Sequence, residues 1–420
     1  MKVFKFGGAS INSIERIKQL AAILQNYPNE KKVVVISAMG KTTNALEKVV
    51  EAFYQGRKAE AAEWFERIKR QHQDTAKYLL VTNANETDIR LSHLFAEVEW
   101  TMHDEPARAF NYYYDQIVCA GELFSTTIIS AYLNEKGIRN KWVDVRDIFR
   151  TDDHFRAAGI DWPVTERNIR EKISPLLDEY DLVITQGFIG ATDENESTTL
   201  GREGSDYSAA VLGNLLNASE VTIWKDVEGI MNADPKTFPQ AVVIPELNYD
   251  EIIEMAYYGA QVIHPKTIKP LENKAIPLFV KCFLDPLLPG TVIRHKATGK
   301  LPPIIIVKNN QALLNLHSKD FSFIEESAIS QLYRFLAEKN ITVNLLQTGA
   351  VTVMVCTDDT NDNVNQLAVA LSGTFDVQVE KQLRLLTIRH YTTPVITEMT
   401  EGKTIVLQQQ SRHTVQCLTR

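Results

Sequence analysis

The chain has 420 residues, of which 44% are hydrophobic and 23% are charged, and its formal net charge is -8. This length predicts two or more domains, and the composition is that of a globular protein. Lysine and arginine are spread along the chain without a basic tract, which argues against nucleic acid as a partner because binders of the phosphate backbone cluster their positive charge.

Strands and helices are predicted to alternate over residues 1–285. Short apolar runs predict strands at Val3–Phe6, Lys32–Met39, Trp142–Val145, Leu182–Phe188, Val221–Trp224 and Ile276–Phe283. Helical spacing follows the first two strands, at 14–24 and 46–53, and residues 57–135 read as a mostly helical excursion. This alternation predicts an α/β fold with a mainly parallel sheet sandwiched by helices.

The N-terminus, MKVFKFGGAS, enters the first predicted strand without a signal-peptide pattern. We expect no apolar run of membrane-spanning length, and therefore a cytoplasmic protein with no membrane partner. The four cysteines lie far apart with no CxxC pair, so neither a zinc site nor a disulfide framework is indicated. Cys282, Cys356 and Cys417 lie in strand-like runs, where buried thiols are expected.

A stretch rich in proline and glycine, 286–303, predicts a linker between a catalytic domain at 1–285 and a second region at 304–420. The second region is predicted to hold two related α+β copies. The first copy covers about 310–381, and the partial second copy covers about 382–420. The second copy ends before the last helix and strand of the first could form.

A weak internal repeat supports these two copies. The matching segments are LLNLHS at 313–318 with LLTIRH at 385–390, and VNLLQTGAVTVMVC at 343–356 with IVLQQQSRHTVQCL at 405–418. Each copy reads strand, helix, strand, strand. Coincidence between two β-rich stretches is the alternative, because short repeats arise easily.

The first strand runs into the glycine turn of Lys5-Phe6-Gly7-Gly8 and then into a helix. Glycines let backbone N–H groups approach a ligand, the helix adds its positive end, and Lys5 can supply a full charge. This is the design of a phosphate cradle, although it matches neither common glycine-rich fingerprint. A tight turn with a surface lysine is the alternative.

Two further motifs lie at helix starts. Ser37-Ala38-Met39-Gly40-Lys41-Thr42-Thr43-Asn44 follows the second strand, and ligands of open α/β sheets gather at the carboxyl ends of strands. Gly121-Glu122 lies near the start of an apolar helix. The alternatives are a helix cap at Thr43 and placement of Glu122 for the helix dipole.

The stretch TLGREGSDYSAA, 199–210, follows the strand that closes with Gln186-Gly187-Phe188. Arg202 offers a planar fork suited to a carboxylate. Asp206 would repel phosphate, so we expect it to hold a lysine or to position a magnesium-bound water. A loop that binds both an acid and a polyphosphate needs this mixture, and an Asp–Arg pair closing a surface turn is the alternative.

Two later motifs complete the series. One is Trp224-Lys225-Asp226-Val227-Glu228-Gly229-Ile230, which leads to Asp234-Pro235-Lys236, and the other runs from Tyr258 to Lys266. His264 precedes a proline at a helix start, so we expect a structural cap or a buried hydrogen-bond partner there rather than a base.

Together these motifs resemble those of the aspartate kinases (aspartokinases), which have the amino acid kinase fold. In chain order they are KFGGAS, SAMGKTTN, GELFST, QGFIG, TLGREGSDYSAA, WKDVEGIMNADPK and YGAQVIHPKT. The C-terminal repeat resembles the paired ACT regulatory modules of that family, with the second module truncated. The resemblance implies that ATP, with Mg²⁺, phosphorylates the side-chain carboxylate of L-aspartate to 4-phospho-L-aspartate, the first step of the lysine, threonine and methionine branch.

The resemblance also implies roles for individual residues. Lys5 would stabilise the transferring phosphoryl group, and Asp206 would orient Lys5. Arg202 would hold the α-carboxylate of aspartate and Glu122 its ammonium group. Further substrate positions are Ser37, Thr43, Phe188 and Ser205, and the nucleotide positions are Lys5, Gly7, Gly8, Lys225, Asp226, Met231, Lys236 and Gln261. No metal-ligating residue is implied.

Five positions depart from the family's common residues: Ala9, Glu203, Lys225, Met231 and Gln261. Glu203 replaces a frequent glycine and adds negative charge near the site. Gln261 replaces a lysine that is common on the nucleotide side, and Lys225 replaces a common threonine, so Lys225 could compensate for the lost charge. Met231 replaces an aromatic residue but can still pack against a base.

Two other functions remain open from the sequence. One is a kinase of the same fold that acts on glutamate, acetylglutamate, carbamate or UMP, and the other is a catalytically silent amino-acid sensor. The strand edges of the truncated module predict a homo-oligomer, a dimer or larger, that forms through the ACT-like region. Lysine or threonine commonly inhibits members of the family, and the sequence leaves the effector open.

Overall fold

The computed structural model describes residues 1–28, 30–261, 263–296, 299–320, 322–360 and 362–420. The chain divides into two compact units. The first is formed by Met1–Ile230, Val243–Ile253 and Ile263–Thr298, and the second by Met231–Val242, Glu254–Val262 and Gly299–Arg420. The second unit therefore includes two short segments from within the predicted catalytic domain.

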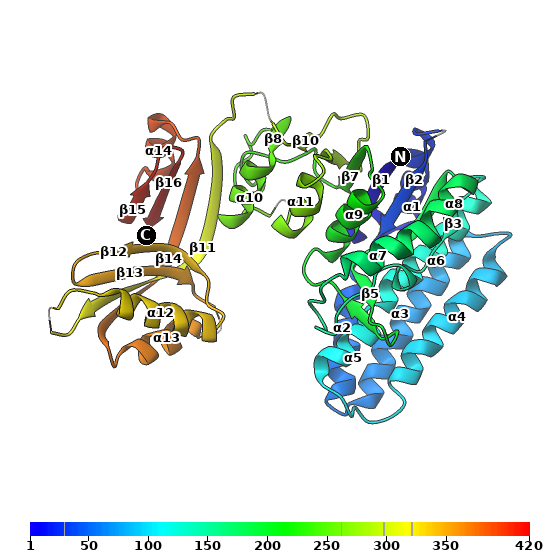
Figure 1. The fold of residues 1–420 in the computed structure, drawn as a ribbon, viewed down its shortest axis with the longest axis horizontal. Coiled ribbons are helices and arrows are strands. Elements are labelled where there is room, and N and C mark those ends of the chain that lie inside the picture. The colour runs from blue at the N-terminus through cyan, green and yellow to red at the C-terminus, as the bar shows by residue number, and fades with distance from the viewer. Residues whose placement is uncertain (29, 262, 297–298, 321, 361) are drawn as a thin grey trace. The chain divides into compact units, whose positions relative to one another are not determined.

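The first unit is built on an eight-stranded sheet with the order β3-β4-β2-β1-β7-β9-β10-β8 (Figure 1). Neighbouring strands are parallel except β9 and β10, which are antiparallel. A separate two-stranded sheet pairs β5 with β6. The strands are β1 Lys2–Phe6, β2 Lys32–Ile36, β3 Lys141–Trp142, β4 Leu182–Gln186, β5 Ile189–Ala191, β6 Ser197–Thr199, β7 Glu220–Lys225, β8 Glu246–Asn248, β9 Leu278–Cys282 and β10 Thr291–Arg294.

Helices connect these strands. They are α1 Ile14–Gln25, α2 Thr42–Tyr54, α3 Lys58–Leu79, α4 Ala84–Thr101, α5 Phe110–Val118, α6 Ala120–Glu135, α7 Trp162–Asn168, α8 Ser174–Glu179, α9 Gly204–Leu215, α10 Tyr249–Tyr257 and α11 Pro265–Glu272, with short turns at η1 Gly8–Ile11, η2 Val145–Asp147 and η3 Ile169–Ile173. The mainly parallel sheet and the helical excursion at 57–135 confirm the sequence prediction.

The two faces of β1 meet different helices. Phe4 and Phe6 belong to a core formed with residues of α1 to α6. Side chains alternate along a strand, so Val3 and Lys5 point to the other face, where α9 packs against β1. The position of Lys5 in the strand therefore directs it toward α9.

Two local predictions need correction. The strand expected at Trp142–Val145 is only Lys141–Trp142 long, because 3-10 helix η2 begins at Val145. Within the stretch 286–303, Thr291–Arg294 forms β10 and pairs with both β8 and β9, so this part of the predicted linker lies in the sheet. Cys282, Cys356 and Cys417 lie in strands and are buried, as expected.

One helical stretch, Phe110–Glu135, is long and apolar enough to cross a membrane by length and composition, contrary to the expectation that none would be. The most apolar 18-residue part of this stretch is 89% buried inside the structure, as expected for a helix in the core of a domain. Its residues, including Phe124 and Ile128, pack in the same core as Phe4 and Phe6.

The second unit holds a six-stranded antiparallel sheet with the order β12-β13-β11-β14-β16-β15 (Figure 1). The strands are β11 Ile304–Ser318, β12 Val343–Thr348, β13 Thr352–Asp358, β14 Phe375–Arg389, β15 Ile405–Gln410 and β16 Thr414–Thr419, and the helices are α12 Glu326–Glu338, α13 Asn363–Leu371 and α14 Thr393–Thr400.

The predicted repeat is visible in the pairing of the strands. The hairpins β12–β13 and β15–β16 carry a register shift at corresponding places, between Val343 and Leu345 and between Ile405 and Leu407. The second copy lacks a second helix but not a fourth strand, because Ile304–Lys308 of β11 pairs with Leu385–Arg389 of β14. In the second half of the sheet, Ile304–Lys308 thus holds the place that the early part of β14 holds in the first half.

Candidate active site

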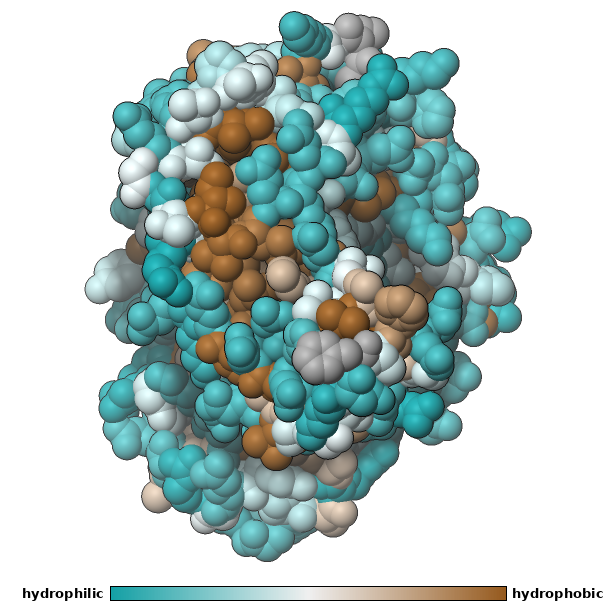
Figure 2. All heavy atoms as spheres, turned by 90° about the vertical axis from the view of Figure 1, so that its left-hand side faces the viewer, coloured by the Kyte–Doolittle hydropathy of each residue, from teal (hydrophilic) through white to brown (hydrophobic). Residues whose placement is uncertain are grey.

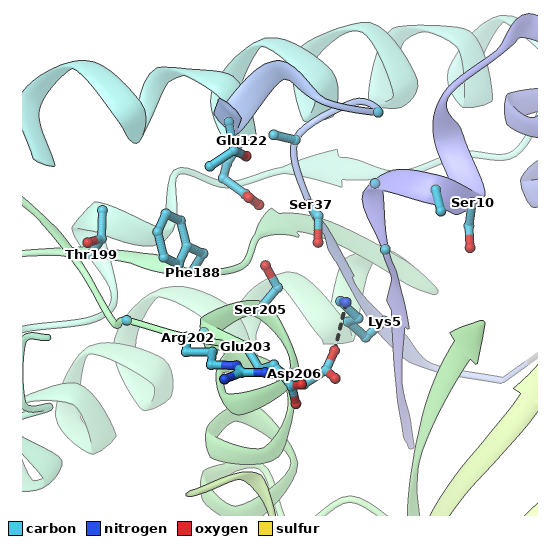
Figure 3. Close-up of a pocket in the computed structure, with 18 of the residues that line it drawn as sticks. Lys5, Ser10, Ser37, Glu122, Phe188, Thr199, Arg202, Glu203, Ser205 and Asp206 are labelled. Carbon is cyan, nitrogen blue, oxygen red and sulfur yellow. Dashed lines mark ion pairs between the residues drawn. The ribbon is translucent and has the colours of Figure 1, made fainter. Parts of the chain in front are cut away.

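A cavity of about 610 Å³ lies at the carboxyl ends of β1, β2, β4 and β7 (Figure 3). Its size suits a small-molecule ligand, and this edge of a parallel sheet is where such ligands bind. Most of the predicted site residues line it: Lys5, Gly7, Gly8, Ser37, Thr43, Glu122, Phe188, Arg202, Ser205, Asp206, Lys225 and Asp226.

Lys5 and Asp206 form an ion pair, with 2.7 Å between Lys5 Nζ and Asp206 Oδ1 (Figure 3). Lys225 Nζ lies 3.8 Å from the other carboxylate oxygen. Burial by itself would raise the pKa of Asp206, but the charges of Lys5 and Lys225 outweigh it and lower that pKa. The buried carboxylate is therefore ionised and holds two cations in the cavity.

Glu122 lies in the first turn of α6 and is buried. Its Oε2 atom has no hydrogen-bond partner among the described residues. Burial raises the pKa of this carboxyl group to about 8, although the N–H groups of Ala38 and Gly187 and the charge of Lys5 act in the opposite direction. A buried acid of this kind is suited to receive a cationic group of a ligand.

Two glycines are required by close approaches of backbone segments. A Cβ atom on Gly8 would lie 2.6 Å from the carbonyl oxygen of Ala38, so the β1 and β2 loops touch there. A Cβ atom on Gly187 would lie 2.6 Å from Cβ of Ser205, so the end of β4 meets the start of α9. These contacts are too short for any other residue, and they bring the loops of three strands to one cavity.

Glu203 has a left-handed backbone conformation, with φ at 53°, and stands at the N-cap of α9. Its Oε2 accepts the backbone N–H of His264 at 2.9 Å. His264 in turn caps α11, and its Nδ1 accepts the N–H of Lys266 at 3.1 Å. The expected cap is confirmed, and Glu203 ties it to the loop that carries Arg202.

Other expectations differ from the structure. Helix α2 begins at Thr42 with Lys41 at its N-cap, so Thr43 is not the cap. Met231, Lys236 and Gln261 do not line the cavity and belong to the second unit. Their contact with a nucleotide stays a prediction.

The cavity is also lined by polar side chains that were not among the predicted site residues, including those of Ser10, Tyr114, Arg156 and Thr199. Thr199 begins the motif TLGREGSDYSAA, so its position could have been read from that motif. Tyr114 and Arg156 lie outside every motif, and only the packing of distant segments brings them to the cavity.

Comparisons with known proteins give the family. The model of the amino acid kinase family matches residues 1–282. Lysine-sensitive aspartokinase 3 of Escherichia coli is 34% identical over 397 residues, which are 92% of this chain and 86% of that protein. The chloroplastic aspartokinase 2 of Arabidopsis thaliana is 34% identical over 85% of this chain, which spans 66% of that longer protein.

Solved structures agree with this relationship. The crystal structure of E. coli aspartokinase III in complex with aspartate and ADP superposes with a TM-score of 0.82 at 30% identity, covering 100% of this chain and 96% of that one. The lysine and aspartate complex of the same enzyme gives a TM-score of 0.83. The chain therefore belongs to the amino acid kinase family. Within that family, the coverage and identity of these relatives place it among the aspartokinases.

Proposed function

We propose that the protein transfers the γ-phosphoryl group of ATP to the side-chain carboxylate of L-aspartate, which gives 4-phospho-L-aspartate and ADP. The observation that carries the proposal is the buried Lys5–Asp206 ion pair, which shares one cavity with Arg202 and Glu122. The cavity thus offers the cation Lys5 to a phosphate chain. It also offers the cation Arg202 and the acid Glu122 to the carboxylate and the ammonium group of an amino acid. The E. coli relative is solved with aspartate and ADP.

In this reaction an oxygen of the side-chain carboxylate attacks the γ-phosphorus, and the bond from that phosphorus to the β,γ-bridging oxygen breaks. The transferring group carries spread negative charge, so positioning and electrostatic stabilisation are the protein's main contributions. Lys5 stabilises this charge, and Asp206 holds the lysine in place. Backbone donors near Gly7 and Gly8 bind the phosphates.

The amino acid is held through its other two charges. Arg202 binds the α-carboxylate through its planar fork. Glu122 binds the ammonium group, which favours the ionised form of that buried acid. Ser37, Thr43, Phe188 and Ser205 complete this end of the cavity.

Magnesium enters as part of MgATP. The described residues include no group of three or more His, Cys, Asp or Glu side chains suited to hold a metal. We therefore place the cation on the phosphates. Lys225, which reaches the Asp206 carboxylate, adds positive charge on the nucleotide side and offsets the absence of a lysine at Gln261.

The test is hydroxamate formation in the presence of ATP, Mg²⁺ and hydroxylamine, with aspartate compared against glutamate. Hydroxylamine traps an acyl phosphate, so aspartate hydroxamate is the expected product. Product from glutamate alone would favour a kinase of another acid. No product from either acid would favour an amino-acid sensor, a function that the retained Lys5–Asp206 pair argues against.

We further propose that the protein is a homo-oligomer assembled through the second unit. Figure 2 shows a band of apolar side chains bordered by polar ones on a face of this unit. Its sheet ends in edge strands β12 and β15, and exposed apolar residues include Tyr333, Val369 and Ile405. Exposed edges and apolar surface favour pairing with a second copy.

A further inference from the structure

A second arginine, Arg156, lines the cavity that Arg202 lines. No ion pair is found for either guanidinium group among the residues that the structure describes. The guanidinium of Arg156 lies 4.4 Å from the ring centre of Tyr114, and its Nη1 is 3.5 Å from Asn111 Oδ1. Two arginines that form no ion pair among the described residues thus line one cavity, although the charge of Arg156 acts on the nearby carboxyl group of Asp115.

The backbone of Arg156 is strained. Its φ is 73°, in the left-handed region where glycine is far more comfortable than a residue with a Cβ atom. Strain of this kind persists where the surroundings hold the residue firmly, and it concentrates at functional sites. An arginine in this conformation, with a side chain that lines the cavity, is therefore a candidate for a role there.

A buried carboxylate holds Arg156 in this conformation. Asp115 Oδ2 accepts the backbone N–H of Arg156 at 2.9 Å and that of Thr199 at 2.8 Å. Asp115 Oδ1 accepts the hydroxyl of Thr199 at 2.7 Å. A Cβ atom on Gly201 would lie 3.1 Å from the carbonyl oxygen of Arg156, so the segment that carries Arg156 is packed closely against the one that leads to Arg202.

These contacts place Arg156 at the acid end of the cavity. Asp115 joins Arg156 to Thr199, and Thr199 and Phe188 lie on the opposite side of the cavity from Lys5 in Figure 3. The phosphoryl end is defined by Lys5, Lys225 and Asp206. Arg156 lines the cavity from the segment that Asp115 ties to Thr199, and a guanidinium group there is suited to a carboxylate, which it can bind through two parallel hydrogen bonds.

We propose that Arg156 is a specificity-determining residue that binds the α-carboxylate of the amino-acid substrate together with Arg202. Asp115 is the positioning residue that holds Arg156 at the cavity. This inference rests on the proposed function and adds to it the reason why an acid with a free α-carboxylate is selected.

The first experiment compares steady-state kinetics of Arg156→Gly and Arg156→Lys with the parent protein. Glycine suits the backbone at this position, so Arg156→Gly removes the guanidinium without adding strain. We expect the aspartate KM to rise about 10- to 100-fold, with the ATP KM unchanged and kcat within about threefold. Lysine keeps the charge without the fork, so its aspartate KM should be intermediate.

The matched control is Arg139→Gly. Arg139 also stacks on a tyrosine, 4.5 Å from the ring centre of Tyr180, but it pairs with Glu179 and does not line the cavity. Its replacement should leave both KM values unchanged. A direct test uses aspartate α-amide, which lacks the α-carboxylate charge: Arg156→Gly should lose much less activity with the amide than with aspartate.

Asp115→Asn tests the positioning role. Introduced into the parent protein, Asp115→Asn should raise the aspartate KM. Introduced into the Arg156→Gly variant, it should raise the aspartate KM little further, because both substitutions act through the guanidinium of Arg156. Should Asp115→Asn fail to fold, the Arg156 variants still decide the proposal.

An unchanged aspartate KM in Arg156→Gly overturns the proposal. A rise in the ATP KM alone also overturns it, because Arg156 would then bind phosphate. An equal loss on aspartate and its α-amide rejects the α-carboxylate contact. Absence of aspartate phosphorylation by the parent protein is a different result, which rejects the proposed function itself.

Discussion

At the scale of single residues, the site is defined by charged side chains in the cavity that the protein itself does not fully neutralise. Asp206 binds Lys5 and lies near Lys225, so this group of three side chains carries a net positive charge. Glu122 and Arg202 are left without an ion pair among the described residues. A ligand with phosphates, carboxylates and one ammonium group would complete these interactions.

Lys5 can be tested against a second lysine in the same strand. Lys5→Met should lower kcat by about 100- to 1,000-fold, since it removes one group that stabilises developing charge. Lys2 lies at the other end of β1 and pairs with Glu30 and Glu220. Lys2→Met should leave kcat unchanged. The measurement is kcat from an assay that couples ADP release to a detectable reaction. An equal fall in kcat in both variants would contradict the role of Lys5.

Glu122 predicts a dependence on pH. Its pKa of about 8 in the folded protein lies above the ordinary 4.5, so the folded state keeps a proton between these values that the unfolded chain has lost. Its contribution to stability therefore falls as the pH rises through this window. Glu122→Gln should remove that part of the pH dependence, as measured by urea unfolding at pH 5 and pH 8.

Aspartate binding should act on the same proton. The ammonium group favours the ionised form of Glu122, so binding at pH 7 should release a proton, measurable by titration calorimetry in two buffers of different ionisation enthalpy. The Glu122→Gln variant should bind aspartate more weakly and release fewer protons on binding. Equal proton release by both proteins would show that Glu122 is not the group involved.

At the scale of elements, the site depends on close approach between a strand end and a helix start. Gly187 follows β4, and its missing side chain makes room for Ser205 in the first turn of α9. Gly187→Ala should destabilise the protein by about 1–3 kcal/mol, because α9 must shift to admit the methyl group. It should also raise the aspartate KM, since Arg202 and Asp206 flank Ser205.

The control for this prediction is Gly373→Ala, where a Cβ atom would meet nothing within 4 Å. Thermal unfolding and steady-state kinetics of the two variants give the comparison. A Gly187→Ala variant as stable and active as Gly373→Ala would show that α9 is not held by this contact.

At the scale of the whole molecule, the second unit completes its sheet with a strand taken from before the repeat. Ile304–Lys308 and the later part of β14 belong to one half of the sheet, while the rest of β11 belongs to the other. The two related halves are therefore joined through two long shared strands. This connection leaves β12 and β15 as the edges available to a second copy.

The oligomer prediction follows from those edges. Size-exclusion chromatography with light scattering should give at least twice the mass of one chain. Ile405→Asp, on edge strand β15, should lower this mass by placing charge on an apolar edge. Trp100→Asp changes an exposed residue of the first unit and should not. A single-chain mass for the parent protein at all concentrations would contradict the prediction.

The order of strands and helices in the first unit, and most of the residues that line the cavity, could be predicted from the amino-acid sequence. Apolar periodicity and glycine turns are local signals, and the strand ends that carry Lys5, Ser37 and Phe188 must meet at one edge of a parallel sheet. The repeat also aligns Val343 with Ile405, and these residues prove to stand beside the register shifts of the two hairpins.

Contacts between distant segments could not be predicted in this way and depend on how the chain packs in three dimensions. The packing of α9 on β1 brings Asp206 to Lys5, and burial from several elements raises the pKa of Glu122. Asp115 of α5 joins Arg156 to Thr199 at the end of β6, and no local pattern marks Asp115 or Arg156. Such contacts depend on which surfaces pack together, a property that the spacing of residues along one segment does not contain.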